Sequence, residues 1–172
     1  MIVKEIRDED FTSYKKPSMV IGFPSCTFKC ERECGQKMCQ NSALTQAPNI
    51  EISTAYIVKR YLDNPITKAI IMAGLEPFDS ANDLFDLIRH IRIYTNDDIV
   101  IYTGYTKDEI KYMSFKTHWS GGILEWSYLE RLSKHPNIIV KFGRFIPNRE
   151  SHYDEILGVK LASDNQYAER VS

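Results

Sequence analysis

All four cysteines of the 172-residue chain lie in one short segment: Cys26, Cys30, Cys34 and Cys39. Disulfides stabilise most when they join distant segments, whereas cysteines this close together in a reducing compartment are typical of metal ligands or redox thiols. The residues between them are mostly charged or polar, which argues against four buried apolar side chains. Soft thiolates bind zinc, copper(I) or iron–sulfur clusters. Residues 25–42 are therefore predicted to form a metal-binding loop.

The spacing of the cysteines fits neither of two common metal sites. Three, three and four residues separate successive cysteines. A structural zinc site usually draws its four cysteines from two short pairs that lie well apart in the sequence. Ferredoxin motifs commonly place two residues between neighbouring ligands. A non-catalytic module in which all four cysteines hold zinc remains an alternative at this point.

The elements that position this loop follow from the apolar pattern. Four short runs rich in β-branched residues are predicted as strands, at 19–23, 69–72, 98–102 and 137–142. Helical spacing covers 54–62 and 81–93, with a weaker helix from Lys107. Candidate caps precede these helices at Ser53, at Asp79 and Ser80, and at Thr106. Alternating strands and helices predict an α/β fold with a parallel sheet.

The length of the chain limits this fold. A closed eight-stranded barrel with its outer helices needs about 200 residues or more. We therefore expect residues 1–172 to form one domain, a partial, open-sided parallel (βα) barrel. Ligands would gather at the carboxyl ends of its strands. Residues 117–122 are predicted to form a loop, and residues 147–172 give no clear element.

Charge and composition indicate which classes of binding partner to expect. The 22 basic and 23 acidic residues leave a net charge of -1, which does not favour nucleic acid or an anionic membrane. A small molecule or another protein fits better. The N-terminal residues lack the apolar core of a signal peptide, and no apolar run approaches the roughly 18 residues of a membrane span. A cytoplasmic protein is expected.

The cysteine pattern resembles that of the radical S-adenosylmethionine enzymes. Cys26-x-x-x-Cys30 follows a predicted strand, and a further cysteine occurs downstream in Cys39-Gln40-Asn41-Ser42. More narrowly, the chain is similar to the activating proteins of anaerobic ribonucleotide reductases. The resemblance implies that three cysteines hold three irons of a [4Fe-4S] cluster, while S-adenosylmethionine binds the fourth through its amino and carboxylate groups. Cys26, Cys30 and Cys39 are the expected ligands, with Cys34 as the alternative third ligand.

The spacing departs from that family. Its second and third cysteines enclose two residues, whereas eight residues separate Cys30 from Cys39. We interpret residues 31–38 as an insertion that contains Cys34. The family commonly has an aromatic residue beside the third cysteine, near the adenine. Met38 and Gln40 occupy these places here and are the expected contacts.

Two downstream segments also resemble the family. Gly74-Leu75-Glu76-Pro77 is similar to its Gly-Gly-Glu-Pro motif, which receives the ammonium group of S-adenosylmethionine. The segment from Tyr102 to Tyr105 is similar to a Tyr-Thr-Gly-Tyr-like strand end. Gly74, Glu76 and Thr103 are therefore further expected cofactor-binding residues. No catalytic residue is expected beyond the cluster and the S-adenosylmethionine site.

The resemblance implies a reaction and partners. An electron donor such as flavodoxin would reduce the cluster, and S-adenosylmethionine would be cleaved to methionine and a 5′-deoxyadenosyl radical. That radical would remove hydrogen from a backbone glycine in the large subunit of an anaerobic (class III) ribonucleotide reductase. An open barrel side would admit the glycine loop. A radical enzyme acting on a small molecule, an activator of another glycyl-radical enzyme, and a non-catalytic zinc or iron–sulfur module are the alternatives.

Overall fold

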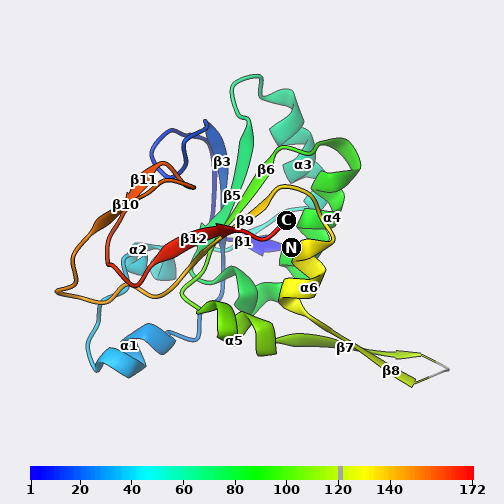
Figure 1. The fold of residues 1–172 in the computed structure, drawn as a ribbon. Helices are drawn as coiled ribbons and strands as arrows, with labels where there is room; N and C mark the ends of the chain where they lie inside the picture. Colours follow the sequence, from blue (N-terminus) through cyan, green and yellow to red (C-terminus); the bar gives the residue numbers. More distant parts are fainter. Residues whose placement is uncertain (120–121) are drawn as a thin grey trace.

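A six-stranded sheet forms the centre of the computed structural model, which describes residues 1–119 and 122–172 (Figure 1). The strands lie in the order β12-β9-β6-β5-β3-β2. Their bounds are β2 Glu5–Asp10, β3 Ser18–Phe23, β5 Ala69–Gly74, β6 Asp98–Tyr102, β9 Ile138–Phe142 and β12 Tyr167–Arg170.

The four predicted strands are the parallel part of this sheet. β3, β5, β6 and β9 pair with one another in the order in which they occur along the chain. β2 and β12 pair antiparallel at the two edges. The α/β prediction is thus confirmed for a mixed, mostly parallel sheet. The sheet is not closed, and the partial barrel stays a prediction.

The helices that begin at Thr54, Ala81 and Lys107 agree with the predicted segments, and a further helix at 128–133 was not predicted. Their bounds are α3 Thr54–Asp63, α4 Ala81–Tyr94, α5 Lys107–Tyr112 and α6 Tyr128–Ser133, with a short 3₁₀ turn, η1 Pro77–Ser80, before α4. The predicted caps at Ser53 and Thr106 are confirmed, because each side chain accepts a backbone N–H of the first turn. Ser80 does not cap α4 through its side chain. The Asp79 carboxylate instead accepts hydrogen bonds from Tyr105 and Thr27.

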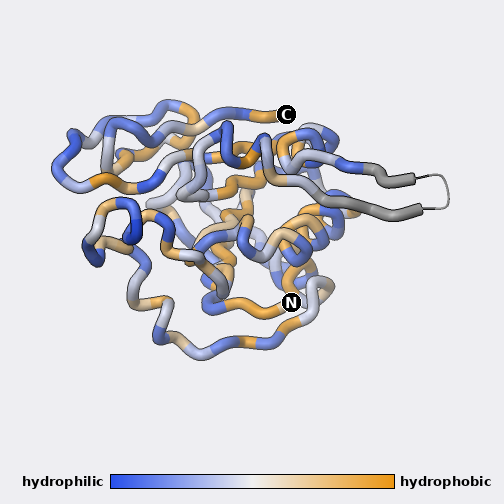
Figure 2. Tube along the Cα trace, turned by 90° about the horizontal axis from the view of Figure 1, so that it is seen from below, coloured by the Kyte–Doolittle hydropathy of each residue, from blue (hydrophilic) through white to orange (hydrophobic). Residues whose placement is uncertain are grey.

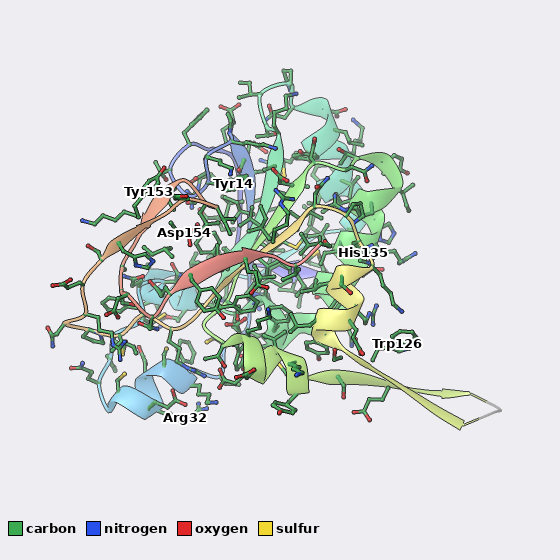
Figure 3. All side chains as sticks on the ribbon, viewed as in Figure 1. Tyr14, Arg32, Trp126, His135, Tyr153 and Asp154 are labelled. Atoms are coloured by element: carbon green, nitrogen blue, oxygen red, sulfur yellow. The ribbon has the colours of Figure 1, made fainter. Side chains whose placement is uncertain are left out.

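Alternate residues of the parallel strands point into two different apolar layers. Ile21, Ile70 and their equivalents are buried against α3, α4, α5 and α6. Val20, Ile71 and their equivalents point to the opposite face, where no helix of this set packs on them. Tyr14 and the turn that follows β10 (His152–Asp154) cover that face (Figure 3). Figure 2 shows the apolar segments concentrated inside the molecule. The burial of both faces explains why these strands are continuously apolar.

Several elements differ from the sequence prediction. Residues 117–119 belong to a strand of the hairpin β7 Ser114–Trp119 and β8 Gly122–Ser127, while 120 and 121 lie outside the described residues. The segment without a predicted element holds β10 His152–Asp154, β11 Val159–Leu161 and the edge strand β12. A small antiparallel pair, β1 Ile2–Val3 and β4 Ile50–Glu51, also escaped prediction. β1, β4, β10, β11 and β12 have only two to four residues each, which is too short for an apolar pattern to reveal them.

Within the part of the chain that the structure describes, no helix has the length and apolarity needed to cross a membrane.

Candidate metal centre and the adjoining cavity

The cysteine segment follows the carboxyl end of β3, at the edge of the sheet where parallel folds bind ligands. Residues 25–42 are predicted as a loop, but they contain the short helix α1 Lys29–Cys34, and a second short helix, α2 Ser42–Gln46, begins at their last residue. α1 ends at Gly35, whose left-handed φ of 67° turns the chain away. Because α1 is short and has no buried residue, its sequence carries no amphipathic pattern that would reveal it.

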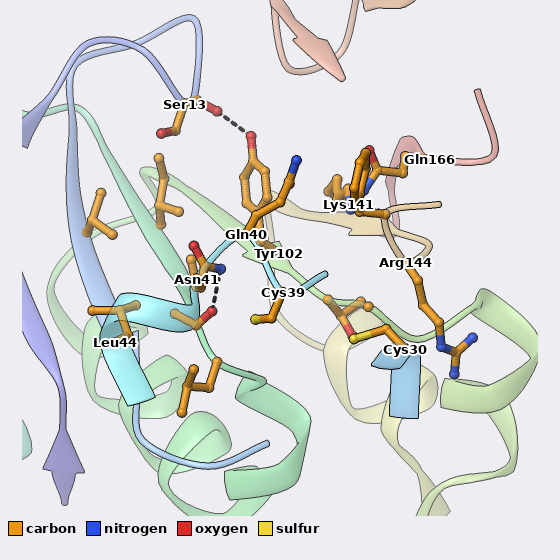
Figure 4. A pocket seen from close by; sticks show the side chains of 18 of the residues that line it. Ser13, Cys30, Cys39, Gln40, Asn41, Leu44, Tyr102, Lys141, Arg144 and Gln166 are labelled. Atoms are coloured by element: carbon orange, nitrogen blue, oxygen red, sulfur yellow. Dashed lines mark hydrogen bonds between the residues drawn. The ribbon is translucent and has the colours of Figure 1, made fainter. Parts of the chain in front are cut away.

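The four thiols differ in their surroundings. Cys30 and Cys39 line one cavity of about 340 Å³ (Figure 4). Cys26 lies before α1, and its Sγ accepts a 3.2 Å hydrogen bond from the Phe28 backbone nitrogen. Cys34 is exposed, one helical turn beyond Cys30. The structure therefore brings Cys30 and Cys39 to the same cavity and leaves Cys34 on the surface.

Electrostatics connect Cys26, Cys30 and Cys39. Burial raises the pKa of Cys26 to about 11, and a negative charge on Cys30 contributes to the same direction. Burial also raises the pKa of Cys30, to which a charge on Cys39 contributes. Three neighbouring thiolates need a compensating positive charge, which the irons of a cluster supply. Among the described residues, no group of three Cys, His, Asp or Glu side chains is placed to hold a single metal ion.

A carboxylate closes the segment between the second and fourth cysteines. Glu31 Oε1 accepts hydrogen bonds from the backbone nitrogens of Met38 and Cys39, at 3.2 and 3.1 Å. Glu31 lies in the first turn of α1, so these bonds bring Cys39 back beside the helix that carries Cys30. The sequence offered no specific signal for this role, because Glu31 is one of several charged residues in the segment.

Backbone and side-chain hydrogen bonds attach the cysteine segment to the ends of the strands. Asn41 Nδ2 donates to the Gly74 carbonyl oxygen at 2.7 Å, at the carboxyl end of β5. The Glu76 backbone nitrogen donates to the Ser25 carbonyl oxygen at 2.8 Å, one residue before Cys26. The sequence pattern around Cys39 included Asn41 without assigning it a function. These bonds fix both ends of the cysteine segment against the same strand.

Gly74 meets a strict backbone requirement. Its φ is 95°, and a Cβ at this position would lie 2.6 Å from the Phe23 backbone nitrogen. The glycine is needed for a close approach to β3, where the sequence predicted a close approach to a ligand. Gly74 nevertheless lines the cavity, so contact with a ligand remains a prediction.

The Glu76 carboxylate is buried and turned toward the end of β6. Its oxygens accept hydrogen bonds from Thr103 Oγ1 and the Gly104 backbone nitrogen, both at 2.9 Å, and from the Phe78 backbone nitrogen at 3.2 Å. Burial outweighs these bonds and raises its pKa to about 7. Glu76 therefore joins the ends of β5 and β6, and it is not among the residues that line the cavity.

An ion-pair network holds α1 beside the cavity. Arg144, which follows β9, donates to Glu109 at 2.7 Å and to Glu33 at 3.2 Å. Lys29 also bonds Glu109. Burial raises the pKa of Glu109, but the bonds from Arg144 and Lys29 reverse this and bring it to about 2. Residues on both sides of Cys30 in the sequence are thus tied to α5 and to the loop after β9.

Most of the predicted site residues meet at one place. Met38, Gln40, Gly74 and Thr103 line the same cavity as Cys30 and Cys39. Sequence reasoning missed the contribution of Tyr102, Lys141, Arg144 and Gln166, which also line it. Tyr102 of β6 and Lys141 of β9 pair in register, and both side chains lie on the face of the sheet opposite the helices. The assignment of ligands among these residues remains a prediction.

Comparison with known families decides the class of cofactor. Residues 19–148, about three quarters of the chain, match the model of the family described as the 4Fe-4S single cluster domain. The chain belongs to this family. No curated protein and no solved structure gives a significant match.

Membership in the 4Fe-4S single cluster domain family agrees with the donor set. The matched range contains all four cysteines and, apart from Ser18 at the start of β3, the four parallel strands. Cysteine thiolates are the usual ligands of [4Fe-4S] clusters, and Cys30 is near enough to Cys26 and to Cys39 for their charges to interact. The residues present fit such a cluster, and the protein is an iron–sulfur protein.

Proposed function

We propose that the protein is a radical S-adenosylmethionine enzyme. Cys26, Cys30 and Cys39 would hold three irons of the cluster, and Cys34 would remain outside it. The observation that carries the proposal is the position of Cys30 and Cys39 in the wall of a cavity at the carboxyl edge of a parallel sheet. A cluster held there has room for an organic ligand beside it. A purely structural metal site would be closed by protein ligands.

The chain's own residues bind and orient in this proposal. The Asn41–Gly74 and Glu31–Cys39 hydrogen bonds keep the cysteine segment against the end of β5. Met38, Gln40 and Thr103 lie along the cavity where the adenosyl and methionyl parts would contact protein. When bound, the cluster and S-adenosylmethionine supply a carbon-centred radical that removes a hydrogen atom.

We further propose that the hydrogen comes from a backbone glycine of a partner protein. The large subunit of an anaerobic ribonucleotide reductase is the partner suggested by the sequence resemblance, with an electron donor such as flavodoxin. The edges of the sheet do not meet, which supports access by a loop of another protein.

Anaerobic reconstitution with iron and sulfide tests the cluster and its open iron. The electron paramagnetic resonance spectrum of the dithionite-reduced protein is expected to change when S-adenosylmethionine is added. Cys39→Ala is expected to lose the cluster, whereas Cys34→Ala is the matched control and retains it. If the spectrum of the reduced cluster does not change when S-adenosylmethionine is added, the protein is a non-catalytic iron–sulfur protein. Loss of the cluster in Cys34→Ala and not in Cys39→Ala would reverse the ligand assignment.

The partner requires a separate experiment. Incubation of the loaded protein with an anaerobic reductase, reductant and S-adenosylmethionine is expected to give a glycyl-radical doublet on the reductase. Consumption of S-adenosylmethionine without that signal would favour a different substrate.

A further inference from the structure

A lysine lies in the floor of the cavity. Lys141 belongs to β9 and pairs in register with Tyr102 of β6, while Gly22 of β3 pairs with Ala73 of β5. These four residues form a row across the parallel strands, near their carboxyl ends and on the face without helices. Gly22 and Ala73, on β3 and β5, have little or no side chain. Tyr102 and Lys141, on β6 and β9, have long side chains with polar ends. The Lys141 residue is 7% exposed and lines the cavity.

The Lys141 ammonium has few partners. Its Nζ donates to the Gly143 carbonyl oxygen at 2.7 Å, although an ammonium has three N–H donors. Gln166 Nε2 approaches the same carbonyl at 3.3 Å, and its Oε1 is used by the Ala162 and Ser163 backbone nitrogens. The Glu76 charge acts on Lys141, but the hydrogen bonds of that carboxylate come from Phe78, Thr103 and Gly104.

The other cations in the cavity wall are already neutralised. Arg7 bonds Glu5 and Asp10, and Arg144 bonds Glu33 and Glu109. Within the described residues, no carboxylate forms an ion pair with Lys141. Lys141 therefore gives the floor of the cavity a positive charge that no described carboxylate contacts directly.

Burial of such a charge opposes folding. Taking an ammonium out of water without an anion in contact is unfavourable, whereas burial of an apolar side chain of similar length is favourable. In agreement, burial lowers the pKa of Lys141 to about 8. The neighbouring inward position on the same strand is Ile139, so an apolar residue suits this face of β9. Among the described residues no carboxylate takes up the remaining N–H donors of this ammonium, which leaves them available to an anion in the cavity.

We infer that Lys141 is an anion-binding residue that takes a carboxylate of the molecule occupying the cavity, with the Gly143 carbonyl holding the ammonium in position. The carboxylate has two possible sources. One is the methionyl carboxylate of S-adenosylmethionine, an assignment that rests on the proposed function. The other is an acidic side chain of the substrate. The anion site itself depends only on the geometry of the cavity.

Thermal unfolding tests the anion site without any enzyme activity. Sodium acetate, compared with sodium chloride at equal ionic strength, is expected to raise the unfolding midpoint of the wild type and of the control Lys160→Met. Lys160 is an exposed lysine on β11. Lys141→Met is expected to unfold at the same or a higher temperature than the wild type, with no acetate-dependent rise. A Lys141→Met protein that fails to fold, or that keeps the rise, would overturn the inference.

Binding measurements identify the source of the carboxylate. Equilibrium dialysis of the cluster-loaded protein would compare S-adenosylmethionine with its decarboxylated analogue. If the methionyl carboxylate is the ligand, Lys141→Met loses roughly 10- to 100-fold affinity for S-adenosylmethionine and none for the analogue. Equal affinities for S-adenosylmethionine in both proteins, with the acetate effect intact in the wild type, would assign the site to the substrate.

The two proposals fail in different ways. If neither adenosyl compound binds the wild type but acetate still stabilises it through Lys141, the radical enzyme assignment fails and the anion site stands. If S-adenosylmethionine binds both proteins equally and acetate stabilises neither, the anion site fails and the radical enzyme assignment stands.

Discussion

The side-chain amide of Asn41 donates a 2.7 Å hydrogen bond to the carbonyl oxygen of Gly74. Asn41 lies two residues after Cys39, and Gly74 is the last residue of β5. This bond connects the last cysteine of the segment to a strand in the middle of the parallel sheet. The position of Cys39 is therefore determined by the core as well as by its own loop.

Removal of this bond should loosen the metal centre. Asn41→Ala is expected to destabilise the folded protein by about 1 kcal/mol and to accelerate loss of the cluster to a chelator several-fold. Asn82→Ala, at an exposed position on α4, is the control. The decay of visible absorbance after addition of chelator measures the rate. Equal decay rates in the two variants would show that the Asn41 bond does not hold Cys39.

Alanine substitutions at Gly74 and Gly35 distinguish the cost of a positive φ from the cost of a steric clash. Gly74→Ala introduces a Cβ 2.6 Å from the Phe23 backbone nitrogen, at a φ of 95°. Gly35 also has a positive φ, 67°, but a Cβ added there by Gly35→Ala would have no heavy atom within 4 Å. Guanidinium unfolding should show a cost of about 1 kcal/mol for Gly35→Ala, and several times that for Gly74→Ala. Similar costs for both variants would contradict the close approach of β3 and β5.

The buried carboxyl group of Glu76 predicts a specific pH dependence. Its pKa is about 7 in the folded protein, against an ordinary value of 4.5. Between these values the folded state holds a proton that the unfolded state has lost, so the unfolding free energy falls as pH rises from 4.5 to 7. The decrease due to Glu76 is on the order of 3 kcal/mol. Urea unfolding of the metal-free protein should show a flatter profile for Glu76→Gln, while Glu150→Gln behaves as wild type.

Glu109 predicts the opposite dependence at lower pH. Burial raises its pKa, but bonds from Arg144 and Lys29 bring it down to about 2 in the folded protein. Stability from these bonds is complete above pH 4.5, the ordinary value, and is lost as pH falls from there toward 2. We expect Glu109→Gln to be less stable than wild type by about 2 kcal/mol at pH 6 and to approach it near pH 2. A constant difference across this range would exclude ionisation as the cause, and Glu155→Gln controls for the loss of a surface charge.

The sequence predicted the four parallel strands and the three helices from Thr54, Ala81 and Lys107 because these elements bury apolar residues at regular spacing. The edge strands β2 and β12 escaped because each is largely polar and depends on a neighbour already in place. α1 escaped for a related reason, since distant ion pairs hold it and no apolar face does.

The residues of the candidate site likewise differ in whether the sequence alone reveals them. Gly74 and Thr103 belong to motifs that the sequence displays, and both line the cavity. Lys141 was visible as a lysine inside an apolar run, but its meaning depends on which face of β9 it occupies and on what lies opposite. The hydrogen bonds from Met38 and Cys39 to Glu31 depend on a backbone path that residue spacing does not specify.

The antiparallel edge strands limit how this architecture can grow. A further strand–helix repeat needs a free parallel neighbour, yet β2 occupies the outer side of β3 and β12 the outer side of β9. Any repeat added at either end would have to displace one of them. Added sequence is therefore accommodated more readily in the connecting loops, such as the one that carries the eight residues between Cys30 and Cys39.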